Sequence, residues 1–384
     1  MTQTRSSTPR TAALLAVAAL LVVAVLFLAT RGPGPGASPS PGASAIQSAT
    51  APSSSSSPAA ESPSGPAASS TGLRATYIST GPIGQNPFLE LIAQGLEEGG
   101  AECGVETRVT ESADIPTMED NLQAAIDEGY DLIVANSFDS VDAVTRLAGE
   151  NPDQQWAIVD SVVDSPNVRG LVFKEHEGTY LLGATFGLLA AGDHEGFPAS
   201  ERIGAVGAVD APFIRRWYVG FEEGAKAVNT GITLDLGWAT GFNDPATSKE
   251  LALAQNDAGA EYVFAFSAAG NTGIFEAAAE RDFLTNGVDT DQRPLDPDHI
   301  IESMVKRTDV GVHEAVCDLA AGDFAGGVSE YGLAENGVGP AFLAIDELDP
   351  PSTIPQEVRD QVADLADQII AGDIVVTDFL AQPQ

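Results

Sequence analysis

The strongest constraint on the fold is a regular alternation of short β-rich runs with helical patterns from residue 73 onward. Each strand and helix pair takes about 25–30 residues, which is typical of β-α-β units. The strand runs, for example 131–135 and 156–160, are dominated by consecutive apolar residues. Such strands are buried on both faces, so we expect parallel sheets covered by helices on each side.

Two series of these units follow one another, separated by a polar break at residues 192–201. Their similar lengths predict an α/β protein with two doubly wound parallel-sheet lobes. We expect lobe 1 at 73–190, lobe 2 at 201–292, and a return of 298–384 to lobe 1 with the C-terminal elements.

The N-terminus predicts attachment to a membrane. Residues 12–29 form an unbroken apolar run of 18 residues, long enough to cross the hydrocarbon core as a helix. Arg5 and Arg10 precede it and would keep the N-terminus in the cytoplasm. We expect an uncleaved anchor, the alternative being a cleaved signal peptide and a secreted protein. Residues 31–72 are rich in Ser, Ala, Pro and Gly, a composition that predicts a disordered tether.

Charge and motifs exclude several classes of function. The formal net charge of -37 argues against nucleic acid as a partner, because phosphate binding needs a basic face. Two cysteines and four histidines leave few ligands for a structural zinc site, and no histidine stands in a metalloprotease spacing. The sequence lacks a G-x-S-x-G elbow and a complete G-x-G-x-x-G loop. We therefore expect no cofactor and no enzymatic activity.

Ligands of parallel α/β sheets bind beyond the carboxyl ends of the strands. The residues predicted at these ends are polar, aromatic or small, and nearly free of positive charge: Ser79, Thr80, Asn136, Ser137, Asp160, Asp210, Phe242, Gly270 and Asp289. An anionic ligand would need Arg or Lys there. This pattern favours a neutral, flat ligand that forms hydrogen bonds, with Asn136 and Gly270 among the candidate contacts.

Seven stretches carry a resemblance to a known family when taken in order: 118–122, 157–160, 177–183, 220–229, 241–245, 287–292 and 303–307. Through them most of residues 75–384 resembles the basic membrane protein family of substrate-binding lipoproteins, which includes purine-nucleoside receptors of ABC importers. The resemblance implies the type I periplasmic-binding-protein fold, in which two lobes joined by a hinge close on a ligand.

The resemblance also implies a base stacked between two aromatic rings, one from each lobe. Phe88 and Phe242 match these aromatic positions, and Asp160 matches a ligand-facing aspartate. Asp289 and Lys306 are candidates for the sugar hydroxyls. Simpler interpretations remain open, since Phe88 could staple a helix to the core and Lys306 could be a solvated surface charge.

The sequence departs from the family before the first aromatic residue. Ser79, Gly84 and Gln85 stand where aspartates are expected. Gln85 or Asn86 could supply some acceptor capacity, although Asn86 also fits a helix N-cap. A different base, or a ligand that is not a nucleoside, is therefore an open alternative. The lipidated cysteine of the family is also absent.

Two cysteines in an oxidising compartment favour pairing. In such folds the helices that carry Cys103 and Cys317 could belong to one lobe, so we expect a disulfide between them.

Together these observations predict a monomeric extracytoplasmic protein, held at the cell membrane, that delivers a nucleoside-like molecule to an ABC permease. A membrane-tethered ligand sensor is the first alternative. A nucleoside-processing enzyme is the second.

Overall fold

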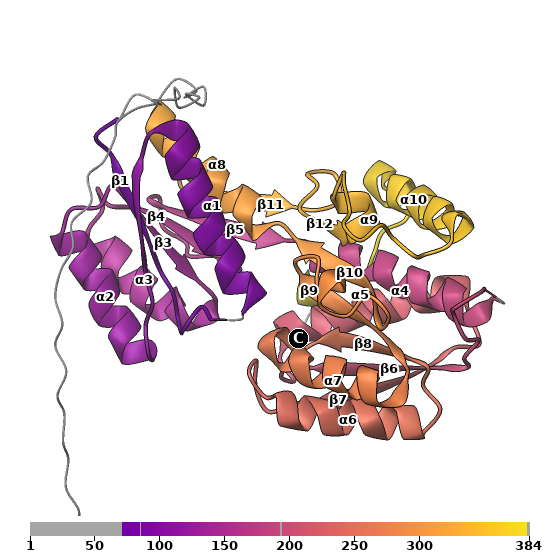
Figure 1. Ribbon diagram of the computed structural model, residues 1–384. Helices are drawn as coiled ribbons and strands as arrows, with labels where there is room; N and C mark the ends of the chain where they lie inside the picture. The colour runs from indigo at the N-terminus through magenta and orange to yellow at the C-terminus, as the bar shows by residue number, and fades with distance from the viewer. Residues whose placement is uncertain (1–70, 85, 193, 382–384) are drawn as a thin grey trace, which may run out of the picture. The chain divides into compact units, whose positions relative to one another are not determined.

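The computed structural model describes residues 71–84, 86–192 and 194–381 (Figure 1). The predicted anchor at 12–29 and nearly all of the tether lie outside these ranges. Within the described ranges, no helix combines the length and the apolar character needed to cross a membrane.

Six parallel strands form the first sheet, in the order β11-β5-β4-β3-β1-β2. Their bounds are β1 (Arg74–Ile78), β2 (Glu106–Thr110), β3 (Leu132–Asn136), β4 (Gln155–Val159), β5 (Val168–Phe173) and β11 (Gly327–Tyr331). Its helices are α1 (Pro87–Cys103), α2 (Ile115–Asp127), α3 (Val141–Glu150) and α8 (Thr308–Ala321). Helices α1 and α8 bury the side chains of one sheet face, and α2 and α3 bury those of the other.

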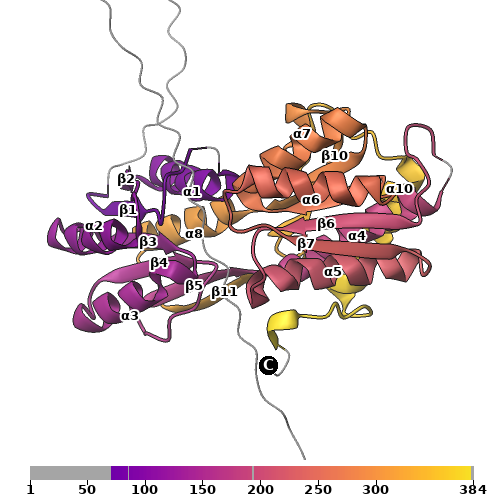
Figure 2. The same cartoon turned by 90° about the horizontal axis from the view of Figure 1, so that it is seen from below.

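The second sheet also has six strands, in the order β12-β10-β9-β8-β6-β7. They are β6 (Arg202–Gly207), β7 (Thr233–Trp238), β8 (Tyr262–Phe266), β9 (Leu284–Asp289), β10 (Ile300–Lys306) and β12 (Val338–Pro340). All pair in parallel except β12, which is antiparallel to β10. The associated helices are α4 (Glu175–Ala191), α5 (Pro212–Val228), α6 (Pro245–Asp257), α7 (Asn271–Arg281), α9 (Ala341–Ala344) and α10 (Gln356–Ala371). Figure 2 shows α5 and α6 on opposite sides of β6 and β7.

Two expected segment assignments are wrong. Residues 175–190 were expected in the first lobe, but α4 packs against α5 and the second sheet. The segment 298–384 was expected to return to the first lobe, but only α8 and β11 do so, because β10 and β12 are strands of the second sheet. The chain therefore passes between the two sheets after β5, after β10 and after β11.

The packing of α4 explains why it joins the second sheet. Gly183 of α4 and Gly224 of α5 let the two helix backbones approach closely, since a Cβ atom on either glycine would clash with the backbone of Phe221 or Tyr180. These glycines lie in two of the stretches that carry the family resemblance. Their role is helix packing rather than ligand contact.

A disulfide joins Cys103, the last residue of α1, to Cys317 of α8, with the Cα atoms 5.3 Å apart. The two helices also touch where Gly99 of α1 faces the backbone of His313. The disulfide therefore fixes a helix pair whose members are 214 residues apart in the sequence.

Candidate functional site

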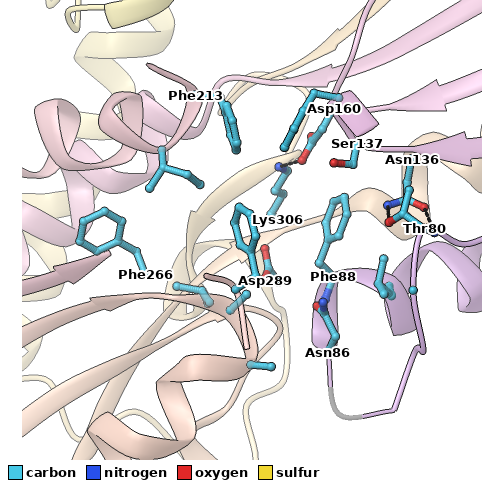
Figure 3. A pocket seen from close by; sticks show the side chains of 18 of the residues that line it. Thr80, Asn86, Phe88, Asn136, Ser137, Asp160, Phe213, Phe266, Asp289 and Lys306 are labelled. Carbon is cyan, nitrogen blue, oxygen red and sulfur yellow. Dashed lines mark hydrogen bonds and ion pairs between the residues drawn. The ribbon is translucent and has the colours of Figure 1, made fainter. Parts of the chain in front are cut away.

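A cavity of about 920 Å³ lies between the carboxyl ends of the two sheets (Figure 3). The first sheet and its loops contribute Thr80, Asn86, Phe88, Asn136, Phe138 and Asp160 to its lining. The second sheet and its helices contribute Glu175, Phe213, Arg216, Trp217, Phe242, Phe266, Asp289 and Lys306. Its position agrees with the rule for ligand sites in parallel α/β sheets.

Four residues of the lining have backbone conformations that residues other than glycine rarely adopt. Ser137, Asp160, Ala268 and Asp289 have φ angles of 69°, 61°, 51° and 67°. All four lie at the carboxyl end of a strand or within two residues of it. Such conformations cost about 1–3 kcal/mol each and gather at functional sites. Their concentration around one cavity marks it as the candidate site.

Lys306 lies at the centre of a buried charge cluster. Its side-chain nitrogen Nζ donates to Asp160 Oδ2 at 2.5 Å and to Glu175 Oε1 at 2.7 Å, and the residue is 2% exposed. Burial acts to lower the pKa of Lys306, but Asp160, Glu175 and Asp289 together outweigh it and raise the pKa above its ordinary value. The interpretation of Lys306 as a solvated surface charge is therefore wrong.

Aromatic rings surround the same ammonium group. Nζ of Lys306 lies 5.3 Å from the ring centroid of Phe88, 5.3 Å from that of Phe173 and 5.7 Å from that of Trp217. These cation–π contacts compensate part of the lost hydration of the ammonium. Two of its three N–H groups are already used, which leaves one donor.

Arg216 and Glu175 extend this cluster and were not predicted from the sequence. Arg216 Nη1 donates to Glu175 Oε2 at 2.9 Å and to the carbonyl oxygen of Phe173 at 2.7 Å. Burial raises the pKa of Glu175, but Lys306 and Arg216 reverse this effect, so its pKa lies below the ordinary value. Both positive charges of the cavity are thus neutralised by carboxylates of the protein.

Among the described residues, Asp289 is the buried carboxylate of the lining whose side chain has no partner. It is 5% exposed, and no hydrogen bond or ion pair reaches its side chain from the described residues. Burial raises the pKa of Asp289 to about 7, and the negative charges of Asp160 and Glu175 add to this rise while Lys306 opposes it. Asp160 Oδ1 is also buried without a partner among the described residues. Buried acceptors normally find donors, so these oxygens are available to a ligand.

The two aromatic residues proposed to hold a base both line the cavity. Phe88 is the second residue of α1, on the side of the first sheet, and Phe242 lies in the loop between β7 and α6 on the side of the second. In Figure 3 the ring of Phe88 points into the cavity beside Lys306. Each side therefore supplies one of the two rings.

Further aromatic residues line the cavity and were missed in the sequence. The ring centroid of Phe213 lies 5.0 Å from that of Phe138 and 6.3 Å from that of Phe242, to which it is nearly parallel at 18°. Phe138 follows β3 and Phe213 is the second residue of α5, so their contact joins the two sides of the cavity. Phe138 follows Asn136 and Ser137, which were predicted at the end of a strand. The rule that ligands bind beyond strand ends, extended by one residue, would therefore have identified Phe138.

Asn86 and Asn136 line the cavity but use much of their hydrogen-bonding capacity within the protein. Asn86 Oδ1 accepts from the backbone N–H of Phe88 at 3.2 Å, as an N-cap does. Asn136 Oδ1 accepts from the Tyr77 hydroxyl at 3.0 Å, and its Nδ2 donates to Thr80 Oγ1 at 3.1 Å. Both residues shape the loop that follows β1.

Of the remaining two candidates, one differs from expectation and the other is not tested. Gly270 does not line the cavity, but its N–H donates to the carbonyl oxygen of Phe242 at 3.1 Å and so supports the aromatic loop. Gln85 lies outside the described residues. Within the described part of the chain, no group of three or more His, Cys, Asp or Glu side chains could hold a metal ion.

Comparisons with known proteins agree with this architecture. The family described as "ABC transporter substrate-binding protein PnrA-like" matches residues 73–378. The chain is 27% identical to the "ABC transporter nucleoside-binding protein BmpA" of Lactococcus lactis, over 80% of this chain and 89% of that protein. It is 28% identical to the "CD4+ T-cell-stimulating antigen" of Listeria monocytogenes, over 79% of this chain and 87% of that protein.

A solved structure, an ABC transporter solute-binding protein from Aeropyrum pernix, superposes with a TM-score of 0.69 at 26% identity. The superposition covers 81% of this chain and 94% of that one. The two-lobed α/β fold is thus shared with a protein described as a solute-binding protein of an ABC transporter. The chain therefore belongs to the PnrA-like family of ABC transporter substrate-binding proteins, whose members bind solutes and are not enzymes.

Proposed function

We propose that the protein captures an uncharged nucleoside-like molecule in the cavity and delivers it to an ABC permease. The observation that carries this proposal is the combination of Phe88 and Phe242 with the unpaired carboxylate of Asp289 in one lining. Aromatic rings stack on a flat base and contribute about 1–3 kcal/mol per base. A carboxylate accepts hydrogen bonds from adjacent sugar hydroxyls.

The charges of the cavity favour an uncharged ligand over a phosphorylated one. Lys306 is held by Asp160 and Glu175, and Arg216 is held by Glu175. A phosphate group would find both cations already neutralised and would face the carboxylate of Asp289. The cost of burying like charges together argues against such a ligand. The relative from Lactococcus lactis, which is named a nucleoside-binding protein, supports the same choice.

The proposal extends to how binding is signalled. Ligand contacts from both sides of the cavity would favour a closed arrangement of the lobes over an open one, with the connections after β5, β10 and β11 as the hinge. The permease would recognise the closed form. An anchor at residues 12–29 and a tether at 31–72 would hold the binding domain at the extracytoplasmic face of the membrane.

Isothermal titration calorimetry of the full-length chain tests the proposed ligand class. The panel contains purine and pyrimidine nucleosides, their free bases, ribose, and the nucleoside 5′-monophosphates. We expect one site for at least one nucleoside, weaker binding of the matching base and of ribose, and no binding of the matching 5′-monophosphate. Tighter binding of a sugar or of a nucleotide than of any nucleoside would contradict the proposal.

A further inference from the structure

The last residues of the described chain return to the ligand cavity. After α10, residues 373–381 lead to α5, and residues 379–381 contact that helix. Figure 2 shows this C-terminal segment in yellow near α5. Val376 is buried in the main core, and the backbone N–H of Thr377 donates to Glu223 Oε2 at 3.0 Å. Leu380 then contributes to the lining of the cavity. The segment is thus anchored on α5 and ends at the ligand site.

Asp378 of this segment forms an ion pair with Arg216. Its Oδ2 accepts from Arg216 Nη2 at 3.1 Å, and its Oδ1 lies 2.9 Å from Arg216 Nε. The opposite edge of the guanidinium is the one that donates to Glu175 and to the carbonyl oxygen of Phe173. The side chains of Arg216 and Asp378 are 12% and 29% exposed, so the pair is partly shielded from water. Asp378 and Glu175 therefore hold the planar guanidinium from both sides.

The contacts continue from Arg216 to the ligand cavity. Glu175 receives Arg216 on Oε2 and Lys306 on Oε1, at 2.9 and 2.7 Å. Lys306 in turn reaches Asp160 of the first sheet. A carboxylate fixed by two cations has little freedom to rotate, so the position of Lys306 depends on how firmly Arg216 is held. Asp378 does not itself line the cavity and acts on it through Arg216, Glu175 and Lys306, which do.

We propose that residues 374–381 are part of the ligand site, with Leu380 as a portion of its wall and Asp378 as a positioning residue that holds Lys306 through Arg216 and Glu175. This inference rests on the proposed function for the identity of the ligand. It adds the C-terminal segment to a site otherwise formed mainly at the strand ends. The affinity for the ligand would then depend on this segment.

Calorimetry with the nucleoside that binds the unaltered protein gives the first test. Asp378→Asn keeps the shape of the side chain but removes its charge. We expect the dissociation constant to rise about tenfold, the factor for one charge-assisted hydrogen bond that a displaced Lys306 no longer donates to the ligand. Asp378→Glu should restore most of the affinity. Asp373→Asn is the matched control, because Asp373 is exposed in the same segment. Leu380→Ala should also weaken binding, whereas Val375→Ala, at a residue that is 81% exposed, should not.

A second measurement needs no ligand. The carboxyl carbon of Asp289 is followed by NMR as a function of pH in the unaltered protein and in Asp378→Asn. The charged groups around Asp289 are Lys306 from β10, Asp160 from the end of β4 and Glu175 from α4. Removing one negative charge and freeing Arg216 to draw Glu175 away from Lys306 should shift the titration midpoint of Asp289 to lower pH.

Calorimetry and the NMR titration together distinguish failure of the positioning role from failure of the proposed function. An Asp378→Asn protein with an unchanged Asp289 midpoint, or with an unchanged dissociation constant, would overturn the positioning role. If no nucleoside binds the unaltered protein, the proposed function fails, while the NMR titration still decides whether Asp378 acts on the cavity.

Discussion

Lys306 Nζ lies 2.5 Å from Asp160 Oδ2, an ion pair that joins the end of β10 in the second sheet to the residue after β4 in the first. Glu175 shares the same ammonium, and all three groups are largely buried. The contact lies at the ligand cavity and next to the connections between the two sheets. It therefore links the stability of the fold to the integrity of the site.

Lys306→Met should destabilise the protein strongly. The substitution leaves Asp160 and Glu175 buried without their shared cation, and breaking a buried pair in this way costs about 3–5 kcal/mol. Urea denaturation measures the change in the free energy of unfolding. Lys226→Met is the matched control, because Lys226 pairs with Glu222 at the surface and should change little. A Lys306 variant as stable as this control would show that the cluster is not buried as described.

Asp289 should make ligand binding depend on pH. Burial raises the pKa of Asp289 to about 7, and a ligand that donates hydrogen bonds prefers the ionised form. The dissociation constant should therefore fall as pH rises from 5 to 8, by up to about tenfold per unit below pH 7. Calorimetry across this range checks the slope. In Asp289→Asn the slope should vanish and binding should be weaker at pH 8.

The same carboxyl group should affect the stability of the ligand-free protein in the opposite direction. A pKa raised above that of the unfolded chain means that the native state binds the proton more tightly between about pH 4 and pH 7. Stability should decrease as pH rises through this window and level off above it. Glu302, whose pKa burial raises to about 7, contributes a similar decrease. Comparing urea denaturation of Asp289→Asn with that of the unaltered protein isolates the part due to Asp289.

Phe88→Ala and Phe242→Ala should each weaken ligand binding about 10- to 100-fold, since each removes a stacking ring. Calorimetry with the best ligand of the panel gives the change. Phe342→Ala provides the control, because Phe342 is partly buried against the core but does not line the cavity. An affinity that survives the Phe242 substitution, or that falls equally in the control, would refute the aromatic sandwich.

The disulfide between Cys103 and Cys317 should stabilise the fold because it closes a long loop. Because the cysteines are 214 residues apart in the sequence, removal of the disulfide should cost up to about 5 kcal/mol. Urea denaturation of the oxidised protein, of the reduced protein and of the double Cys→Ala variant gives the difference. The double variant should be as stable as the reduced protein, and added reductant should not change its free energy of unfolding. Two thiols that react with an alkylating agent before any reduction would contradict the pairing.

The strands and the position of the cavity could be predicted because they depend on local patterns. Continuous apolar runs identified the parallel strands, and the strand-end rule selected Asp160 and Asp289, which both line the cavity. These residues follow their strands directly, so their location depends on little beyond the strand assignment. Phe88 and Phe242 came from the family resemblance, and both also lie in the lining.

Asp160 and Lys306 were candidates from the sequence, but the rest of the charge cluster could not be predicted, because it depends on tertiary packing. Glu175 and Arg216 lie in helices, and they meet only because α4 crosses to the second sheet and packs closely on α5. That crossing depends on close helix contacts such as the one at Gly183. The sequence alone does not show which helix such a glycine will contact. Asp378 lies 162 residues from Arg216 along the chain. Its role follows only from the path of the C-terminal segment.

Photolabelling with a nucleoside that carries an azide on its base tests the central claim most directly, because it reports where a ligand lies rather than how tightly it binds. The full-length chain is irradiated with 8-azidoadenosine and the labelled peptides are identified by mass spectrometry. We predict adducts on the peptides that contain Phe88 or Phe242, which disappear when excess unmodified adenosine is present. Labelling confined to other peptides, or labelling that adenosine does not suppress, would contradict a base held between the two sides of the cavity.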